Sequence, residues 1–155
     1  MSIDEFGWFT INILIPIFLP LLGVLPFKMM PLPEGVEVRF ISLVKDGQWC
    51  WTAICIGASS LYELWVANSQ NLVVSGSAEV LIFFNAFLIA LSICLASGGA
   101  VFSTPILDKN YSYREWFLNY RLMLGSFFLV SFISIISFLI HIALVALTNN
   151  SNLGK

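Results

Sequence analysis

The chain has 155 residues, of which 59% are hydrophobic and only 10% are charged, and its mean hydropathy is +0.91. A typical soluble domain carries about 25% charged residues, so this composition excludes an ordinary water-soluble fold. The formal net charge of -2 is small and points to no particular partner. We therefore expect an all-α integral membrane protein whose apolar surface is covered by the lipid bilayer.

Four apolar segments are long enough to cross a membrane, because a helix needs roughly 20 apolar residues to span the hydrocarbon layer. These segments are expected at residues 8–27, 48–67, 78–102 and 122–147. The stretches between them are too short to fold around a core of their own. The sequence thus predicts one polytopic domain over residues 1–155, built as a small bundle of four transmembrane helices.

The first apolar segment contains Pro16, Pro20 and Pro26. Each proline lacks a backbone donor, so this helix is expected to be kinked or broken, with neighbouring helices satisfying the carbonyls that are left free. The bend serves either packing or gating. The residues before the segment are acidic rather than basic, unlike a secretory signal, so we expect this span to be retained.

Two longer loops connect the spans in pairs, at residues 28–47 and 103–121. The first mixes charged and apolar residues and is expected to form an amphipathic helix or a short strand along the membrane surface. In the second, Ser112 and Glu115 form an S-x-x-E capping box, which predicts a helix that starts near Tyr113.

Aromatic residues of this second loop stand beside Arg114 and Arg121. Basic residues interleaved with aromatic ones occur in proteins that bind single-stranded nucleic acid, and also at membrane interfaces. Because the segment leads directly into a span, the sequence favours the interfacial helix and predicts no nucleic-acid partner.

Basic residues are distributed unevenly between the two sides of the predicted membrane. Six of the seven lie in the two long loops: Lys28, Arg39, Lys45, Lys109, Arg114 and Arg121. Only Lys155 lies on the opposite side. Since loops rich in lysine and arginine stay in the cytoplasm, both termini should be non-cytoplasmic, which in a bacterium means an inner (cell) membrane protein with periplasmic termini.

Polar side chains within the spans are costly in lipid and are therefore candidates for function. Glu63 and His141 lie in the outer halves of the second and fourth spans, and Asn12 and Asn85 fall at a similar depth in the other two. The four helices are therefore expected to share one polar layer.

The fourth span adds Ser134 and Ser137, which share one helix face with His141 because spacings of three and four return to the same side. Two interpretations of the polar layer remain open. It is either a titratable Glu63–His141 pair or small cavity that binds an ion or a partner's side chain, or a network of interhelical hydrogen bonds that fixes the packing.

The sequence offers no recognisable catalytic, metal or cofactor motif. It has no HExxH, no phosphate-binding loop and no GxSxG serine, and the three cysteines show no metal-ligand spacing. Ser137 and His141 resemble a dyad by spacing alone, but a serine in a helix commonly bonds its own backbone. We therefore expect a protein that is not an enzyme and carries no cofactor or metal.

By elimination, the sequence favours a small protein that recognises another membrane protein. An immunity-type protein that protects against a membrane-targeting toxin is the first hypothesis. The alternatives are an accessory subunit of a transport or secretion complex and a holin-like or channel-forming protein, which would need a homo-oligomer to form a pore. A ridge of small residues suits close helix contacts: Ser92, Ala96 and Ala100.

Overall fold

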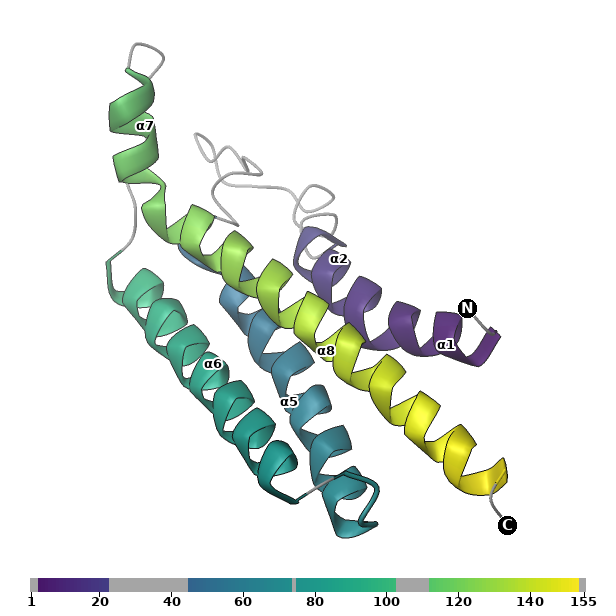
Figure 1. The fold of residues 1–155 in the computed structure, drawn as a ribbon. Coiled ribbons are helices and arrows are strands. Elements are labelled where there is room, and N and C mark those ends of the chain that lie inside the picture. The colour runs from purple at the N-terminus through teal and green to yellow at the C-terminus, as the bar shows by residue number, and fades with distance from the viewer. Residues whose placement is uncertain (1–2, 23–44, 74, 103–111, 154–155) are drawn as a thin grey trace.

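The computed structural model describes residues 3–22, 45–73, 75–102 and 112–153, and within these ranges the chain is helical and has no strand (Figure 1). The elements are α1 (Ile3–Phe9), the π-helix η1 (Thr10–Leu14), α2 (Ile15–Leu22), α5 (Trp49–Ser69), α6 (Ser75–Val101), α7 (Tyr113–Asn119) and α8 (Arg121–Leu153). The predicted all-α fold is therefore confirmed for the described residues.

Three helices are long and apolar enough to cross a membrane, over Trp49–Ser69, Gly76–Val101 and Arg121–Asn149. Their limits lie close to those predicted for the second, third and fourth spans. The first predicted span, residues 8–27, is not confirmed, because the apolar helix found there is shorter, Glu5–Pro20. Residues 23–27 lie outside the described residues.

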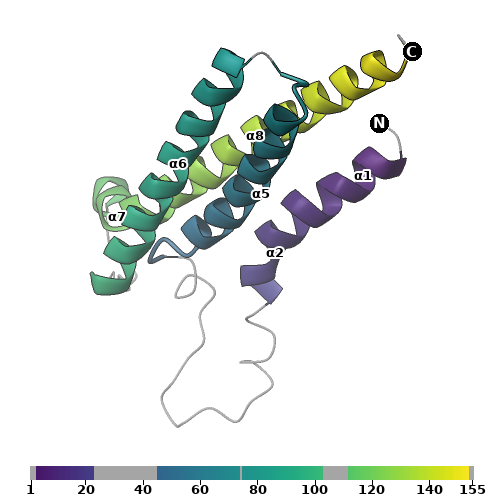
Figure 2. The same cartoon turned by 90° about the horizontal axis from the view of Figure 1, so that it is seen from below.

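Helix α5 is the centre of the bundle and packs along both α6 and α8, which contact each other much less (Figures 1 and 2). α6 runs antiparallel to α5, whereas α8 runs parallel to it with a constant register. Trp49 packs against Phe127 and Glu63 contacts His141, and both pairs are 78 residues apart. The buried core between the three helices consists of Cys50, Ala53, Ile56, Leu88, Ala96, Leu129, Val130 and Ile133.

The two ends of the bundle differ in charge. One end, here called the acidic end, carries Glu5, Glu63 and Glu79, and both chain termini lie there (Figure 2). The other, called the basic end, carries all three basic residues of the described ranges, Lys45, Arg114 and Arg121, together with two acidic ones, Asp46 and Glu115. The charge asymmetry of the sequence is thus also an asymmetry of the folded bundle.

The N-terminal segment α1–η1–α2 has the irregularity that its prolines predict. Its middle is a π-helix, in which the backbone N–H of Ile15 donates to the carbonyl of Thr10, five residues earlier. Such π segments are rare and occur frequently at functional sites. The wider turn brings the two flanking α-helical parts into one continuous but uneven helix.

The neighbouring helix α5 satisfies a carbonyl that a proline leaves free. Pro20 lies inside α2 and has no N–H to donate to the carbonyl of Pro16, its usual helical partner. Instead, the hydroxyl of Thr52 on α5 donates to that carbonyl at 3.0 Å. The bond ties the N-terminal segment to the bundle towards its basic end. Pro26 lies outside the described residues.

This compensation is testable with a double-mutant cycle. Thr52→Val should lower the free energy of unfolding by about 1–2 kcal/mol, because it leaves the Pro16 carbonyl unsatisfied. In a Pro20→Ala background the loss should be smaller, since the helix then supplies its own donor. The measurement is unfolding by SDS in mixed micelles, with Thr10→Val as the control, because the Thr10 hydroxyl bonds its own helix. Equal losses in both backgrounds would contradict the assignment.

The predicted capping box is present at the start of α7. Ser112 is the N-cap, and its backbone N–H donates to the Glu115 carboxylate at 3.0 Å. Tyr113 is 96% exposed, which fits a helix whose aromatic face lies against lipid headgroups. The surface segment expected within residues 28–47 lies outside the described residues, apart from residues 45–47.

A tight backbone contact joins α5 and α6 at the basic end. A Cβ added at Gly99 would lie 1.8 Å from the carbonyl oxygen of Asp46, in the turn that leads into α5. The sequence predicted a small-residue ridge through Ser92, Ala96 and Ala100. Ser92 and Ala96 are buried, but the ridge continues at Gly99, and Ala100 is exposed. The helical repeat of 3.6 residues explains the difference, because Gly99 returns to the contact face more closely than Ala100.

Alanine substitutions at the adjacent Gly99 and Gly98 should therefore differ in their effect on the stability of the protein. Gly99→Ala should destabilise the protein by about 1–3 kcal/mol, because backbone must move to accept the new methyl group. Gly98→Ala is the matched control, since a Cβ there meets nothing within 4 Å. It should be neutral or stabilising, because alanine favours helix by about 1 kcal/mol over glycine. Midpoints of thermal unfolding in detergent would decide, and equal midpoints for the two variants would refute the contact.

Candidate functional site

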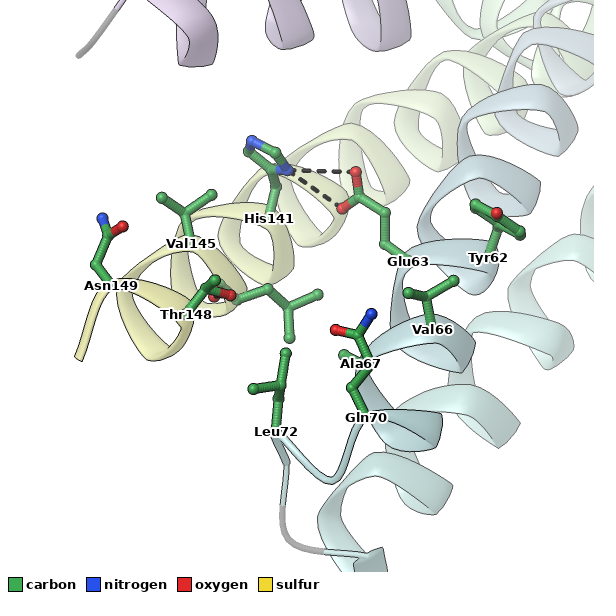
Figure 3. A pocket seen from close by; sticks show the side chains of 11 residues that line it. Tyr62, Glu63, Val66, Ala67, Gln70, Leu72, His141, Val145, Thr148 and Asn149 are labelled. Atoms are coloured by element: carbon green, nitrogen blue, oxygen red, sulfur yellow. Dashed lines mark hydrogen bonds and ion pairs between the residues drawn. The ribbon is translucent and has the colours of Figure 1, made fainter. Parts of the chain in front are cut away.

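Glu63 of α5 and His141 of α8 face each other near the acidic end (Figure 3). The imidazole Nδ1 lies 3.3 Å from each oxygen of the Glu63 carboxylate. Their side chains are only 22% and 14% exposed. A carboxylate in such surroundings needs a partner, because removing an ion from water costs several kcal/mol. The structure thus brings together the two ionisable residues that the sequence placed at equal depth.

Trp8 of α1 completes this contact. Its indole ring lies parallel to the His141 imidazole, with ring centroids 3.8 Å apart and planes inclined by 10°. Its indole N–H donates to Oε1 of Glu63. We call Trp8, Glu63 and His141 the Glu63 cluster. Trp8 is not among the site residues expected from the sequence; the signal that points to it is its indole N–H, which needs an acceptor when a tryptophan is buried in a membrane protein.

Asn12 supports the cluster from the π-helical turn. Its side-chain amide donates to the carbonyl of Trp8 at 3.1 Å, and its Oδ1 accepts a hydrogen bond from the hydroxyl of Ser59 at 2.7 Å. Ser59 lies four residues before Glu63 and therefore on the same face of α5. Asn12 thus joins the backbone of Trp8 to α5, so that its predicted place in a polar layer has a structural counterpart.

Asn85 lies elsewhere, in the contact between α5 and α6. A Cβ added at Gly57 would lie 3.3 Å from Asn85 Oδ1, and Asn85 is only 2% exposed. Its Nδ2 has no hydrogen-bond partner within the described part of the chain. The same holds for the buried hydroxyls of Ser60 and Ser137. We call Ser60, Asn85 and Ser137 the inner trio.

The inner trio forms the next level of the three-helix core. Each of its members lies one helical turn from a core residue on the same helix, namely Ile56, Leu88 and Ile133. The predicted polar layer therefore divides into two groups, the Glu63 cluster with Asn12, where the N-terminal segment meets α5 and α8, and the inner trio, at the next level of the three-helix core. Ser134 belongs to neither, because its hydroxyl donates to the carbonyl of Val130 in its own helix at 2.7 Å.

Substitution by leucine should change the free energy of unfolding in opposite directions at Asn85 and at Asn12. Asn85→Leu should raise the free energy of unfolding by about 1–3 kcal/mol, because it removes a buried donor that has no acceptor. Asn12→Leu should lower it by a similar amount, because it breaks two hydrogen bonds and strands the Ser59 hydroxyl. SDS unfolding of both variants provides the comparison. A loss of stability at Asn85 would show that its amide is engaged in the folded protein.

An open cavity of about 370 Å³ lies between the ends of α5 and α8, with Glu63 and His141 on its inner side (Figure 3). Its walls are mainly apolar and include Val66, Leu144 and Val145. Polar groups line the remainder: Tyr62, Gln70, Thr148 and Asn149. The volume falls within the ~300–1,000 Å³ typical of ligand pockets, and a charged group at the inner side gives it a fixed polar contact.

Within the described ranges, no three His, Cys, Asp or Glu side chains come close enough to hold a metal ion. Ser137, the other half of the dyad considered from sequence, belongs to the inner trio and shares no hydrogen bond with His141. Comparison with protein-family models, curated proteins and solved structures finds no match for this chain.

Proposed function

We propose that this protein is a small, non-enzymatic membrane protein that acts by binding another membrane protein, as an immunity-type protein that protects against a membrane-targeting toxin. The observation that supports this proposal is the cavity with Glu63 and His141 of the Glu63 cluster at its inner side. Ionisable residues in membrane helices are costly and mark functional contacts by default. Here a carboxylate, an imidazole and an indole meet from three separate segments, and the carboxylate and the imidazole border a space open to a partner.

The shape of the bundle favours partner binding over permeation. A channel within one chain would need a polar path along the whole bundle. From the inner trio towards the basic end, the described helices instead meet through an apolar core that includes Ile56, Leu88 and Val130. The hydroxyls of the buried polar residues Thr52, Ser92 and Ser126 are bound to backbone carbonyls there. A holin-like pore would therefore require several copies. An accessory subunit of a transport or secretion complex would use the same cavity, and only its biological partner would differ.

We also propose that the first apolar segment, predicted over residues 8–27, crosses the membrane as a fourth helix, with both termini on the non-cytoplasmic side of an inner membrane. In support, this segment runs antiparallel to α5, because Trp8 meets Glu63 at the acidic end and Pro16 meets Thr52 further towards the basic end. The six basic residues of the two long loops favour a cytoplasmic basic end. The cavity would then open to the periplasm, where an invading toxin arrives.

The test is protection in a cell that carries an intact membrane-targeting toxin gene beside the gene for this protein. Deletion should kill such cells but spare those with a disrupted toxin gene. Glu63→Gln should abolish protection at an unchanged protein level, with partner affinity reduced by about tenfold or more. His141→Ala should act in the same way. Glu79→Gln, at the start of α6 and outside the cavity, is the matched control.

Two outcomes would reject the proposal. If Glu63→Gln and His141→Ala still protect fully, or lose protection only as far as they lose protein, the Glu63 cluster serves packing alone. If expression of the protein by itself collapses the membrane potential, permeabilisation replaces protection as its activity.

A further inference from the structure

We infer that the cavity at the acidic end receives a basic side chain, a lysine or arginine of the partner protein, whose charge contacts the Glu63 carboxylate. This inference rests on the proposed function, because it takes the ligand to be part of a bound protein. It adds the chemical class of the group that is recognised and the residue that recognises it.

The Glu63 carboxylate has acceptor positions left for such a group. Its two oxygens offer about four lone-pair directions. The Trp8 indole N–H takes one on Oε1, and the His141 Nδ1 lies 3.3 Å from both oxygens. None of the lysines or arginines in the described ranges is near, since all of them lie at the basic end. The side chain is 22% exposed and borders the cavity, so a cation entering from the acidic end reaches it directly.

The walls of the cavity suit the remainder of a long basic side chain. Lysine and arginine carry an apolar stem of three or four methylene groups below the charged head. Val66, Leu144 and Val145 provide apolar surface for that stem between Glu63 and the ends of α5 and α8. Tyr62 and Gln70 also line the cavity, and both residue types carry an oxygen that can accept a hydrogen bond from an N–H group. An anionic ligand would instead bring its charge against Glu63.

Charge complementarity extends beyond the cavity. The sequence places four acidic residues on the side of the acidic end, Asp4, Glu5, Glu63 and Glu79, and a single base, Lys155, at the last position of the chain. A field of this sign attracts a basic partner and speeds its association. The same field disfavours an acidic partner, so the charge of the whole end agrees with the charge of the site.

The binding test uses the full-length protein in dodecyl maltoside, which is uncharged, and the indole NMR signals of tryptophan labelled with ¹⁵N. Trp8→Phe assigns the Trp8 signal. The probe is n-butylguanidinium, and its neutral isostere n-butylurea is the control ligand. Butylguanidinium should shift the Trp8 signal saturably, whereas butylurea should not. Glu63→Gln should weaken this response by about tenfold or more, and Glu79→Gln should leave it unchanged.

Equal responses to butylguanidinium and butylurea, or an unchanged response in Glu63→Gln, would overturn the inference. A second arm adds phosphatidylethanolamine to the micelles. If this lipid alone gives the same Glu63-dependent shift and blocks butylguanidinium, the occupant is a lipid amine and the protein side chain is rejected.

The cell assay separates this inference from the proposed function. Loss of protection in Glu63→Gln, combined with no binding of butylguanidinium, would leave the protective role standing and remove the basic ligand. Binding of butylguanidinium at Glu63, combined with survival of toxin-carrying cells after deletion of the gene for this protein, would leave a cation site and remove the protective role.

Discussion

The placement of one carboxylate, that of Glu63, within an apolar helix is the constraint on which the arrangement of the bundle depends. Helix α5 cannot satisfy this group by itself, because its backbone donors are already used in the helix. The partners come from α1 and α8, as the indole N–H of Trp8 and the imidazole of His141. Charge satisfaction therefore draws the N-terminal segment against the pair formed by α5 and α8, and fixes the register of these elements at the acidic end.

The π-helical turn follows from the same constraint. Trp8, Asn12 and Pro16 all meet α5 or a group bound to it, and they are spaced by four residues. In an α-helix with 3.6 residues per turn, each step of four overshoots a full turn by about 40°. The wider π turn, with its bond to the fifth preceding residue, reduces this drift. Trp8, Asn12 and Pro16 would otherwise rotate progressively away from α5, and the π turn keeps them on one side of the segment.

The sequence predicts well where helices begin and end and how deep a residue lies in the membrane. It predicts poorly which side of a helix faces its neighbours. The limits of the three long helices follow from apolar length, and the Ser112–Glu115 capping box is read directly from its spacing, whereas the first predicted span is not confirmed. The Glu63–His141 contact follows from equal depth. Equal depth does not predict that Asn85 lies apart from this contact, because its position depends on how each helix is turned about its axis. In a span that is apolar on all sides, no amphipathic pattern reveals which side faces its neighbours.

The tight apolar packing and the proposed binding site occupy different halves of the bundle. The basic half holds the apolar three-helix core and the glycine contact at Gly99, which permits little adjustment because backbone meets backbone. The acidic half holds the Glu63 cluster, the inner trio and the cavity. The cavity reduces packing contacts, and the two groups of side chains place polar atoms in a low-dielectric interior, where they are costly. The helices that carry Glu63 and His141 are held together at their other end by this tight packing. The binding site that we propose would therefore be pre-organised before a partner arrives.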